Sequence, residues 1–142
     1  MVCTFFGHRN IEKNIKERLE SEINSLISAG VERFLVGNNG YFDYLAQILL
    51  EKLSSSNKNI KYEIVLSYIN EKAISGNQHS TVFPEELELV PLKFRISKRN
   101  SYLIKSSDIA VVYVNNKFTN SYKWAKRAEA SGLKLVYLLD KI

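Results

Sequence analysis

The sequence contains little of several residue types that mark whole classes of protein. Among its 142 residues there is a single cysteine, Cys3, so an internal disulfide is excluded and a reducing compartment is favoured. No apolar run approaches the roughly 18 residues that a membrane-spanning helix needs. The apolar start at residues 1–6 ends at Gly7, which is too early for the hydrophobic core of a signal peptide. We therefore expect a cytoplasmic protein without a membrane partner.

Metal ligands and glycine-rich nucleotide motifs are also scarce. The two histidines, His8 and His79, do not form a metal-binding pattern with Cys3, so we expect no metal. Cys3 lies inside a predicted strand without a neighbouring base, which argues against a cysteine nucleophile. Neither a Walker motif nor a G-x-G-x-x-G motif occurs. We therefore expect no resident cofactor and no enzyme class that these motifs define.

What is present is an ordinary globular composition with a basic excess. The chain is 45% hydrophobic and 25% charged, and its length suits a single domain over residues 1–142. A net charge of +5 favours anionic partners. Most basic residues alternate with glutamates on predicted helix faces, which is typical of a solvated surface. One segment has no acidic residue and is the better candidate for contacting phosphate: Lys93, Arg95, Lys98, Arg99 and Lys105.

Apolar runs alternate along the chain with segments of helical periodicity. The runs predict strands at residues 2–6, 33–36, 62–67, 109–114 and 134–139. Helical spacing predicts four helices. The first runs from an N-cap at Asn10 to a stop at Gly30, and the second covers residues 42–53. The third covers residues 97–106 with Ser97 as its N-cap, and the fourth covers residues 121–131 and ends before Gly132. The polar stretch 70–81 is predicted to be a surface loop. We therefore expect an α/β protein with a three-layer Rossmann-like fold, a mostly parallel sheet of about five strands and helices on both faces.

The loops that follow the predicted strands carry the candidate site, because open parallel sheets bind ligands beyond their carboxyl edge. Loops 7–10 and 37–40 lead straight into helices, whose N-termini attract anions, and loop 115–121 ends at the same edge. The first turn of the helix expected at Ser97 should reach this edge, whereas Asp108 enters its strand from the opposite one. The candidate ligand-binding residues are Gly7, His8, Arg9, Gly37, Asn38, Asn39, Asp43, Arg99, Asn100, Tyr113, Asn115 and Ser121.

Each of these features has a plain structural alternative. Residues 7–9 could form only a tight turn, and residues 37–40 only a backbone turn, because Asn and Gly both adopt positive φ. Asp43 could simply complement the helix macrodipole. Tyr113 could be a packing aromatic rather than a group that stacks on a base or bonds a phosphate. Residue types alone therefore favour a phosphate-binding edge without establishing catalysis.

Four motifs in register resemble the small YpsA-like branch of the SLOG superfamily. They read TFFGHR at 4–9, VGNNGYFD at 36–43, FRISKRN at 94–100 and SDIAVVYV at 107–114, and the resemblance covers nearly the whole chain. The superfamily includes the LOG phosphoribohydrolases, the DNA-processing protein DprA and sensor domains for ADP-ribose derivatives. The resemblance implies a nucleotide site with Gly7 and Arg9 at the phosphate, residues 37–39 as a second wall, and Arg99 and Asn100 at the rim.

The chain departs from this family after its fourth predicted strand. Relatives carry a glycine pair where this sequence reads FTNS at 118–121, so side chains would narrow the approach to phosphate, although Ser121 could bond an anion as an N-cap. The glycine-rich motif of the LOG enzymes and its catalytic glutamate are also missing, and Glu129 lies too far along the last helix to replace it. The pocket is therefore expected to differ from those of the relatives.

Three functions follow as hypotheses. The first is a protein that senses or sequesters a nucleotide-derived ligand, ADP-ribose-like or cyclic. The second is an enzyme that cleaves an N-glycosidic or phosphoester bond, with Arg9 and Arg99 on phosphate and Asp43 or His8 as acid or base. The third is single-stranded nucleic-acid binding as in DprA, through basic charge and the aromatic side chains Tyr102, Tyr113, Tyr122 and Trp124. Small proteins of this superfamily often associate, so a homo-oligomer is expected.

Overall fold

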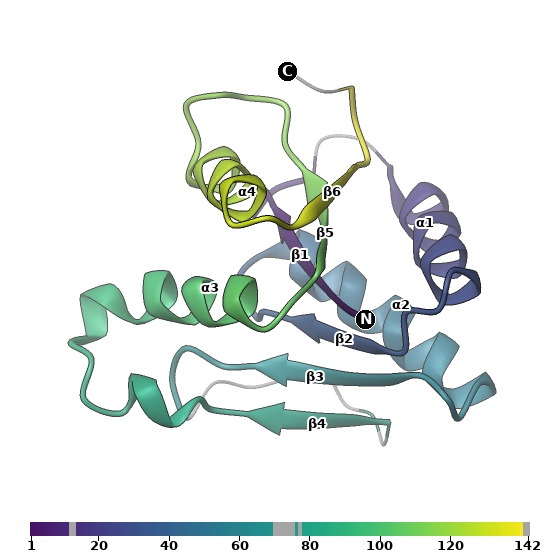
Figure 1. Cartoon of the computed structure of the whole chain (residues 1–142), viewed down its shortest axis with the longest axis horizontal. Helices are drawn as coiled ribbons and strands as arrows, with labels where there is room; N and C mark the ends of the chain where they lie inside the picture. The colour runs from purple at the N-terminus through teal and green to yellow at the C-terminus, as the bar shows by residue number, and fades with distance from the viewer. Residues whose placement is uncertain (12–13, 70–75, 77, 141–142) are drawn as a thin grey trace.

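The computed structural model describes residues 1–11, 14–69, 76 and 78–140 (Figure 1). Within these residues the chain forms an α/β fold with six strands and four α-helices. The strands are β1 (Val2–Gly7), β2 (Arg33–Val36), β3 (Lys61–Val65), β4 (His79–Val82), β5 (Ile109–Tyr113) and β6 (Lys134–Tyr137). The helices are α1 (Lys16–Ser28), α2 (Tyr41–Ser56), α3 (Arg95–Lys105) and α4 (Asn120–Ala130), and the short 3-10 turns η1 (Glu85–Leu87) and η2 (Leu92–Phe94) precede α3.

All six described strands are parallel and form one sheet in the order β4-β3-β2-β1-β5-β6. The chain first moves outward from β1 to β4 and then returns to place β5 on the other side of β1. The strand order therefore reverses between β1 and β5, whose register pairs Gly7 with Tyr113. This reversal places the carboxyl ends of two central strands next to each other.

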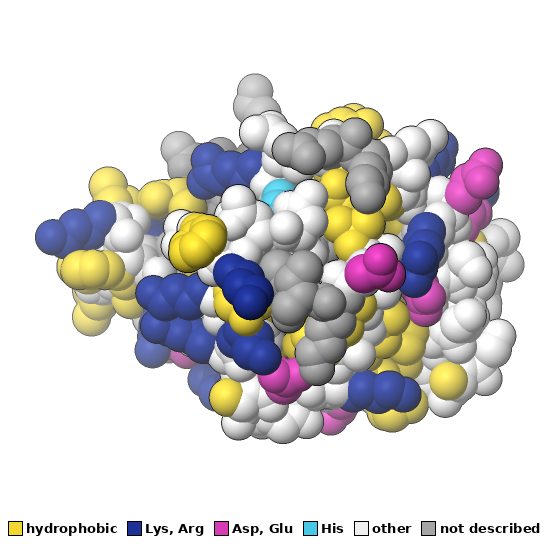
Figure 2. Space-filling view, turned by 90° about the horizontal axis from the view of Figure 1, so that it is seen from above, with side chains coloured by type: hydrophobic (Ala, Val, Ile, Leu, Met, Phe, Trp, Pro, Cys, Tyr) yellow, Lys and Arg dark blue, Asp and Glu magenta, His cyan; other side chains and the backbone are white. Residues whose placement is uncertain are grey.

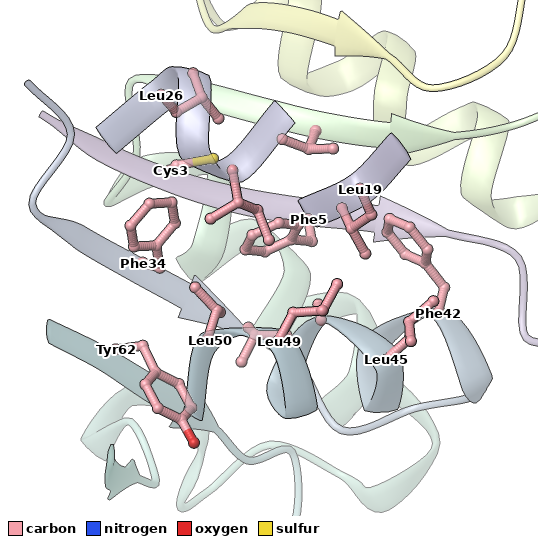
Figure 3. Packing of buried hydrophobic residues seen from close by; sticks show 14 of the residues in the cluster. Cys3, Phe5, Leu19, Leu26, Phe34, Phe42, Leu45, Leu49, Leu50 and Tyr62 are labelled. Atoms are coloured by element: carbon pink, nitrogen blue, oxygen red, sulfur yellow. The ribbon is translucent and has the colours of Figure 1, made fainter. Parts of the chain in front are cut away.

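The helices cover the sheet in two pairs, which produces the three layers of a Rossmann-like fold. Figure 3 shows the cluster in which α1 and α2 pack on one face through side chains such as Leu19, Phe42 and Leu49. On the other face, α3 and α4 pack through Leu103 and Trp124 against the alternate residues of the same strands. Because both faces are covered, the central strand β5 is buried and apolar at every residue.

The structure corrects several predicted boundaries. The sheet has six described strands rather than about five, because β4 adds an edge strand where residues 70–81 were predicted to be a loop; residues 70–75 and 77 lie outside the described residues. Helix α1 begins at Lys16 rather than after Asn10. Helix α3 begins at Arg95 without a side-chain cap, so the prediction of Ser97 as its N-cap is wrong. The predicted stops are confirmed by positive φ at Gly30 and Gly132.

None of the described helices is long and apolar enough to cross a membrane.

Candidate functional site

Two adjoining hollows open at the point where the strand order reverses. The first has a volume of about 320 Å³ and is lined by residues from β1, α2, η2, α3 and α4, including Gly7, Asp43 and Arg99. The second has a volume of about 390 Å³ and lies over the loops after β1 and β5. Both are lined by Arg9, Asn120 and Ser121. The position agrees with the rule that open parallel sheets bind ligands at such a reversal.

The loop after β1 is held by its two neighbours. The backbone N–H of His8 donates to the carbonyl oxygen of Tyr113 at 3.3 Å, which extends the pairing of β1 with β5. The carbonyl oxygen of Arg9 accepts from the N–H of Tyr41 at 2.8 Å, at the start of α2. Gly40, whose φ is +105°, packs so closely that a Cβ there would lie 2.6 Å from the Cα of Arg9. The backbone of Arg9 is therefore fixed, while its exposed side chain lines both hollows.

Gly7 and Tyr113 serve the packing beneath this loop. A Cβ on Gly7 would collide with the ring of Phe42, and that ring stacks on Tyr113 with centroids 5.8 Å apart. Tyr113 is fully buried and is not among the residues that line either hollow. Its ring also meets His8 edge-on at 5.6 Å, and Nε2 of His8 accepts from the N–H of Asn115 at 3.0 Å. These contacts fix the orientation of the His8 imidazole at the second hollow.

The loop after β2 is tied to the start of α2. Gln47 donates through Nε2 to the carbonyl oxygen of Gly37 at 2.8 Å and to Oδ1 of Asn38 at 3.1 Å. Asp43 accepts through Oδ2 from the N–H of Asn39 at 3.0 Å. Gly37 and Asn38 do not line either hollow, whereas Asn39 and Asp43 line the first. The loop thus forms a preorganised wall whose inner groups are engaged with one another.

Arg99 is buried at the floor of the first hollow and is only 2% exposed. Its Nη1 donates to the carbonyl oxygen of Val65 at the end of β3, and its Nε donates to Oδ1 of Asn100, both at 3.1 Å. With the Asn39 amide oriented to satisfy both of its neighbours, its oxygen accepts from Nη2 of Arg99 at 2.8 Å. The resemblance implied a rim position for Arg99, but the guanidinium instead bridges β3 to the loop after β2.

Gly37 makes room for two opposite charges. A Cβ at Gly37 would lie 2.8 Å from Nη1 of Arg99 and 2.8 Å from Oδ2 of Asp43. Both atoms therefore border the space beside the Cα of Gly37. A carboxylate near a buried guanidinium offsets part of the cost of removing both charges from water. Only a residue without a side chain leaves space for this arrangement.

The loop after β5 closes the edge around the start of α4. The side chain of Thr119 accepts from the N–H of Tyr122 at 3.3 Å and is the N-cap of α4, so the prediction of Ser121 in that role is wrong. Ser121 instead donates through Oγ to the carbonyl oxygen of Gly7 at 2.8 Å. This bond fastens α4 to β1, and it positions the first turn of the helix beside both hollows.

Basic side chains outnumber acidic ones around the first hollow. Four basic residues line it against one acidic residue, Asp43; the basic residues are Arg9, Lys93, Arg99 and Lys123. The first turns of α3 and α4 also line it, through Ile96, Ser97, Asn120 and Ser121, and helix N-termini attract anions. Figure 2 shows Lys and Arg side chains gathered on the side of the molecule nearer the start of α3. This hollow is therefore suited to a phosphate group.

The structure brings together most of the residues predicted for the site. Gly7, Arg9, Asn39, Asp43, Arg99, Asn100 and Ser121 line the first hollow, and His8 and Asn115 line the second. Only some residues of the basic segment that was predicted to contact phosphate lie at the site. Lys93 and Arg99 line the first hollow, whereas Arg95 bonds the carbonyl oxygen of Val90, and Lys98 and Lys105 pair with Glu86. Residue-type reasoning missed Lys123, because a lysine in a helix resembles any solvated surface residue.

Groups suited to acid–base chemistry are few at this edge. Asp43 is the only carboxylate among the described residues that line the two hollows. Burial raises the pKa of the Cys3 thiol far above its ordinary value, so this side chain stays protonated and inert. Within the described part of the chain, no three His, Cys, Asp or Glu side chains are placed to hold a metal ion. Among the described residues that line the two hollows, Asp43 and His8 are thus the side chains suited to proton transfer.

No family model matches the chain, and a search of curated proteins finds none that is significantly similar to it.

Proposed function

We propose that this protein binds a nucleotide-derived ligand, ADP-ribose-like or cyclic, at the carboxyl edge of its sheet, and acts as a sensor or sequestering protein. The observation that carries the proposal is the first hollow, where Arg9, Lys93, Arg99 and Lys123 and two helix starts surround one space. It lies at the reversal of strand order, where open parallel sheets bind ligands. Charge-assisted hydrogen bonds from such groups favour phosphate over uncharged ligands.

A relation to the small YpsA-like branch of the SLOG superfamily belongs to the same proposal. The Rossmann-like architecture supports it, as does the gathering of residues 7–9, 37–40 and 99–100 at one edge. A cytoplasmic location and a homo-oligomeric state are further parts of this proposal. Native mass spectrometry of the purified protein would report the number of subunits and the mass of any ligand that copurifies.

Isothermal titration calorimetry at low ionic strength tests the binding function. The panel would contain ADP-ribose, ADP, AMP and cyclic AMP. The Lys93→Ala/Lys123→Ala variant should bind the best ligand at least tenfold more weakly, and added salt should weaken wild-type binding. Lys134→Ala, at an exposed lysine that begins β6, is the matched control and should bind like the wild type. No measurable heat with any member of the panel would contradict the proposal.

Hydrolysis of an N-glycosidic or phosphoester bond is the second candidate, and the carboxylate of Asp43 in the first hollow is what favours it. The same carboxylate accepts from the N–H of Asn39, which supports a structural role. Mass spectrometry after prolonged incubation separates the two functions, because turnover converts the ligand and binding leaves it unchanged. A product formed by the wild type but not by Asp43→Asn would establish the enzyme.

Single-stranded nucleic-acid binding receives less support. Stacking needs accessible aromatic faces, yet Tyr113 is fully buried and Trp124 is 8% exposed. A gel shift with single-stranded DNA at several salt concentrations would decide this function, since binding through basic charge must weaken as salt is added.

A further inference from the structure

The second hollow differs in chemistry from the first, although the two adjoin. It is lined by His8, Arg9, Asn10, Asn115, Asn116, Thr119, Asn120 and Ser121. Arg9 is the only residue of this set with a fixed charge. Four of the others carry side-chain amides, and the remainder contribute an imidazole and two hydroxyls. The second hollow is therefore polar but nearly uncharged.

The amides around the two hollows are used differently. Two amides line the first hollow alone, those of Asn39 and Asn100, and both are engaged with Arg99. At the second, the side-chain amides of Asn10 and Asn115 make no hydrogen bond to another described residue. An amide offers both donors and an acceptor, as do the edges of a nucleobase and the hydroxyls of a ribose. The second hollow therefore presents recognition groups for an uncharged polar ligand.

Segment 115–119, which carries the Asn115 amide, is preorganised by hydrogen bonds. The N–H of Phe118 donates to Oδ1 of Asn116 at 2.8 Å, and the hydroxyl of Thr119 donates to the carbonyl oxygen of Asn116 at 2.9 Å. The N–H of Asn115 donates to Nε2 of His8 at 3.0 Å, which is possible only when this nitrogen carries no proton. A wall fixed in this way loses little conformational entropy when a ligand binds.

We propose that the ligand spans both hollows, with a phosphate or diphosphate among the basic side chains of the first and an uncharged nucleoside among the amides of the second. The inference rests on the proposed function and narrows it to compounds with one anionic part and one neutral polar part. Arg9 lines both hollows, so its guanidinium would contact the phosphate that joins the two parts. A second anionic group at the nucleoside end would meet neutral amides and would weaken binding.

Calorimetry with two probes that share a diphosphate tests this assignment. Under this assignment pyrophosphate occupies the first hollow, whereas ADP adds a nucleoside for the second. At equal ionic strength the wild type should bind ADP more tightly than pyrophosphate. The Asn10→Ala/Asn115→Ala variant should lose about tenfold in ADP affinity, as expected for two hydrogen bonds, and bind pyrophosphate unchanged. Asn24→Ala, at an exposed asparagine of α1, is the matched control.

The possible failures separate the two proposals. Equal binding of ADP by the wild type and the double asparagine variant would overturn the two-hollow assignment and leave the anion site intact. The two-hollow assignment is also overturned if the wild type binds ADP no more tightly than pyrophosphate, or if the variant loses affinity for ADP and pyrophosphate equally. A wild type that binds neither probe would overturn this inference, and it would overturn the proposed function as well if ADP-ribose, AMP and cyclic AMP also gave no heat. Thermal unfolding of each variant would show that the fold is unchanged.

Discussion

Replacing Gly37 by alanine is the perturbation that tests the buried charge cluster most severely. The added Cβ would lie 2.8 Å from Nη1 and 2.9 Å from Cζ of Arg99, and 2.8 Å from Oδ2 of Asp43. Ordinary contact distances are longer, so the guanidinium, the carboxylate or the loop must move by several tenths of an ångström. Because Arg99 bonds Val65, Asn100 and Asn39 at once, it cannot shift without weakening one of these bonds.

The magnitude follows from the bonds at risk. A hydrogen bond from a charged donor contributes about 1.5–3 kcal/mol, and overpacking of a filled interior adds about 1 kcal/mol. Gly37→Ala should therefore destabilise the protein by about 2–4 kcal/mol, which lowers the melting temperature by roughly 6–12 °C in a domain of this size. Gly132→Ala is the control, because its positive φ is strained but no atom lies within 4 Å of the added Cβ. Gly132→Ala should lower the free energy of unfolding by only about 1–2 kcal/mol.

Urea unfolding followed by the fluorescence of Trp124, the only tryptophan, measures these values. A double-mutant cycle isolates the contact with Arg99, because removing this side chain relieves its collision with the added Cβ and leaves the collision with Asp43. Gly37→Ala/Arg99→Ala should therefore be less destabilised than the sum of its two single variants. Additive costs, or a Gly37→Ala variant as stable as the wild type, would refute the view that this glycine exists to accommodate Arg99 and Asp43.

Three further variants test other parts of the structure. Burial raises the pKa of Cys3 above its ordinary 9.0, so its contribution to stability is complete below that pH and is lost as the pH rises. Between pH 8 and 10 the wild type should lose about 1 kcal/mol of stability that Cys3→Ala does not lose, measured by urea unfolding; equal losses would contradict this. Tyr62→Phe removes a hydroxyl that donates to Glu51 at 2.8 Å, and calorimetric unfolding should show a cost of about 1–2 kcal/mol; an unchanged stability would contradict a stabilising bond. Ser121→Ala breaks the bond to Gly7, so it should lower stability by about 1 kcal/mol and weaken ADP binding; unchanged affinity would exclude Ser121 from positioning the site.

The alternation of elements was predictable because apolar side chains repeat with the period of each element. The buried run at β5 and the amphipathic spacing of α2 made both evident. Strand β4 escaped prediction because an edge strand needs no apolar alternation, and HSTV at 79–82 has little. The start of α3 was misplaced because the helix continues directly from η2 at Phe94 and needs no N-cap hydroxyl.

Only the parts of the candidate site that directly follow a predicted strand could be predicted from the sequence. Residues 7–10 and 37–40 follow strands directly, so their shared edge was evident from the predicted order of elements. The burial of Arg99 could not be predicted, because burial of an arginine depends on partners such as Val65 and Asp43 that are distant in the sequence. Lys123 was missed for the same reason, since only the packing of α4 brings its side chain to the first hollow.

Mapping amide chemical shifts by NMR during a pyrophosphate titration at low ionic strength tests the central claim most directly. A phosphate in the first hollow should shift the amide signals of Gly7, Arg9, Ser97 and Ser121, and the shifts should shrink as salt is added. The double variant Lys93→Ala/Lys123→Ala should need at least ten times more pyrophosphate for the same shifts. Shifts confined to residues away from the reversal between β1 and β5, or no shifts at all, would contradict an anion site at this edge.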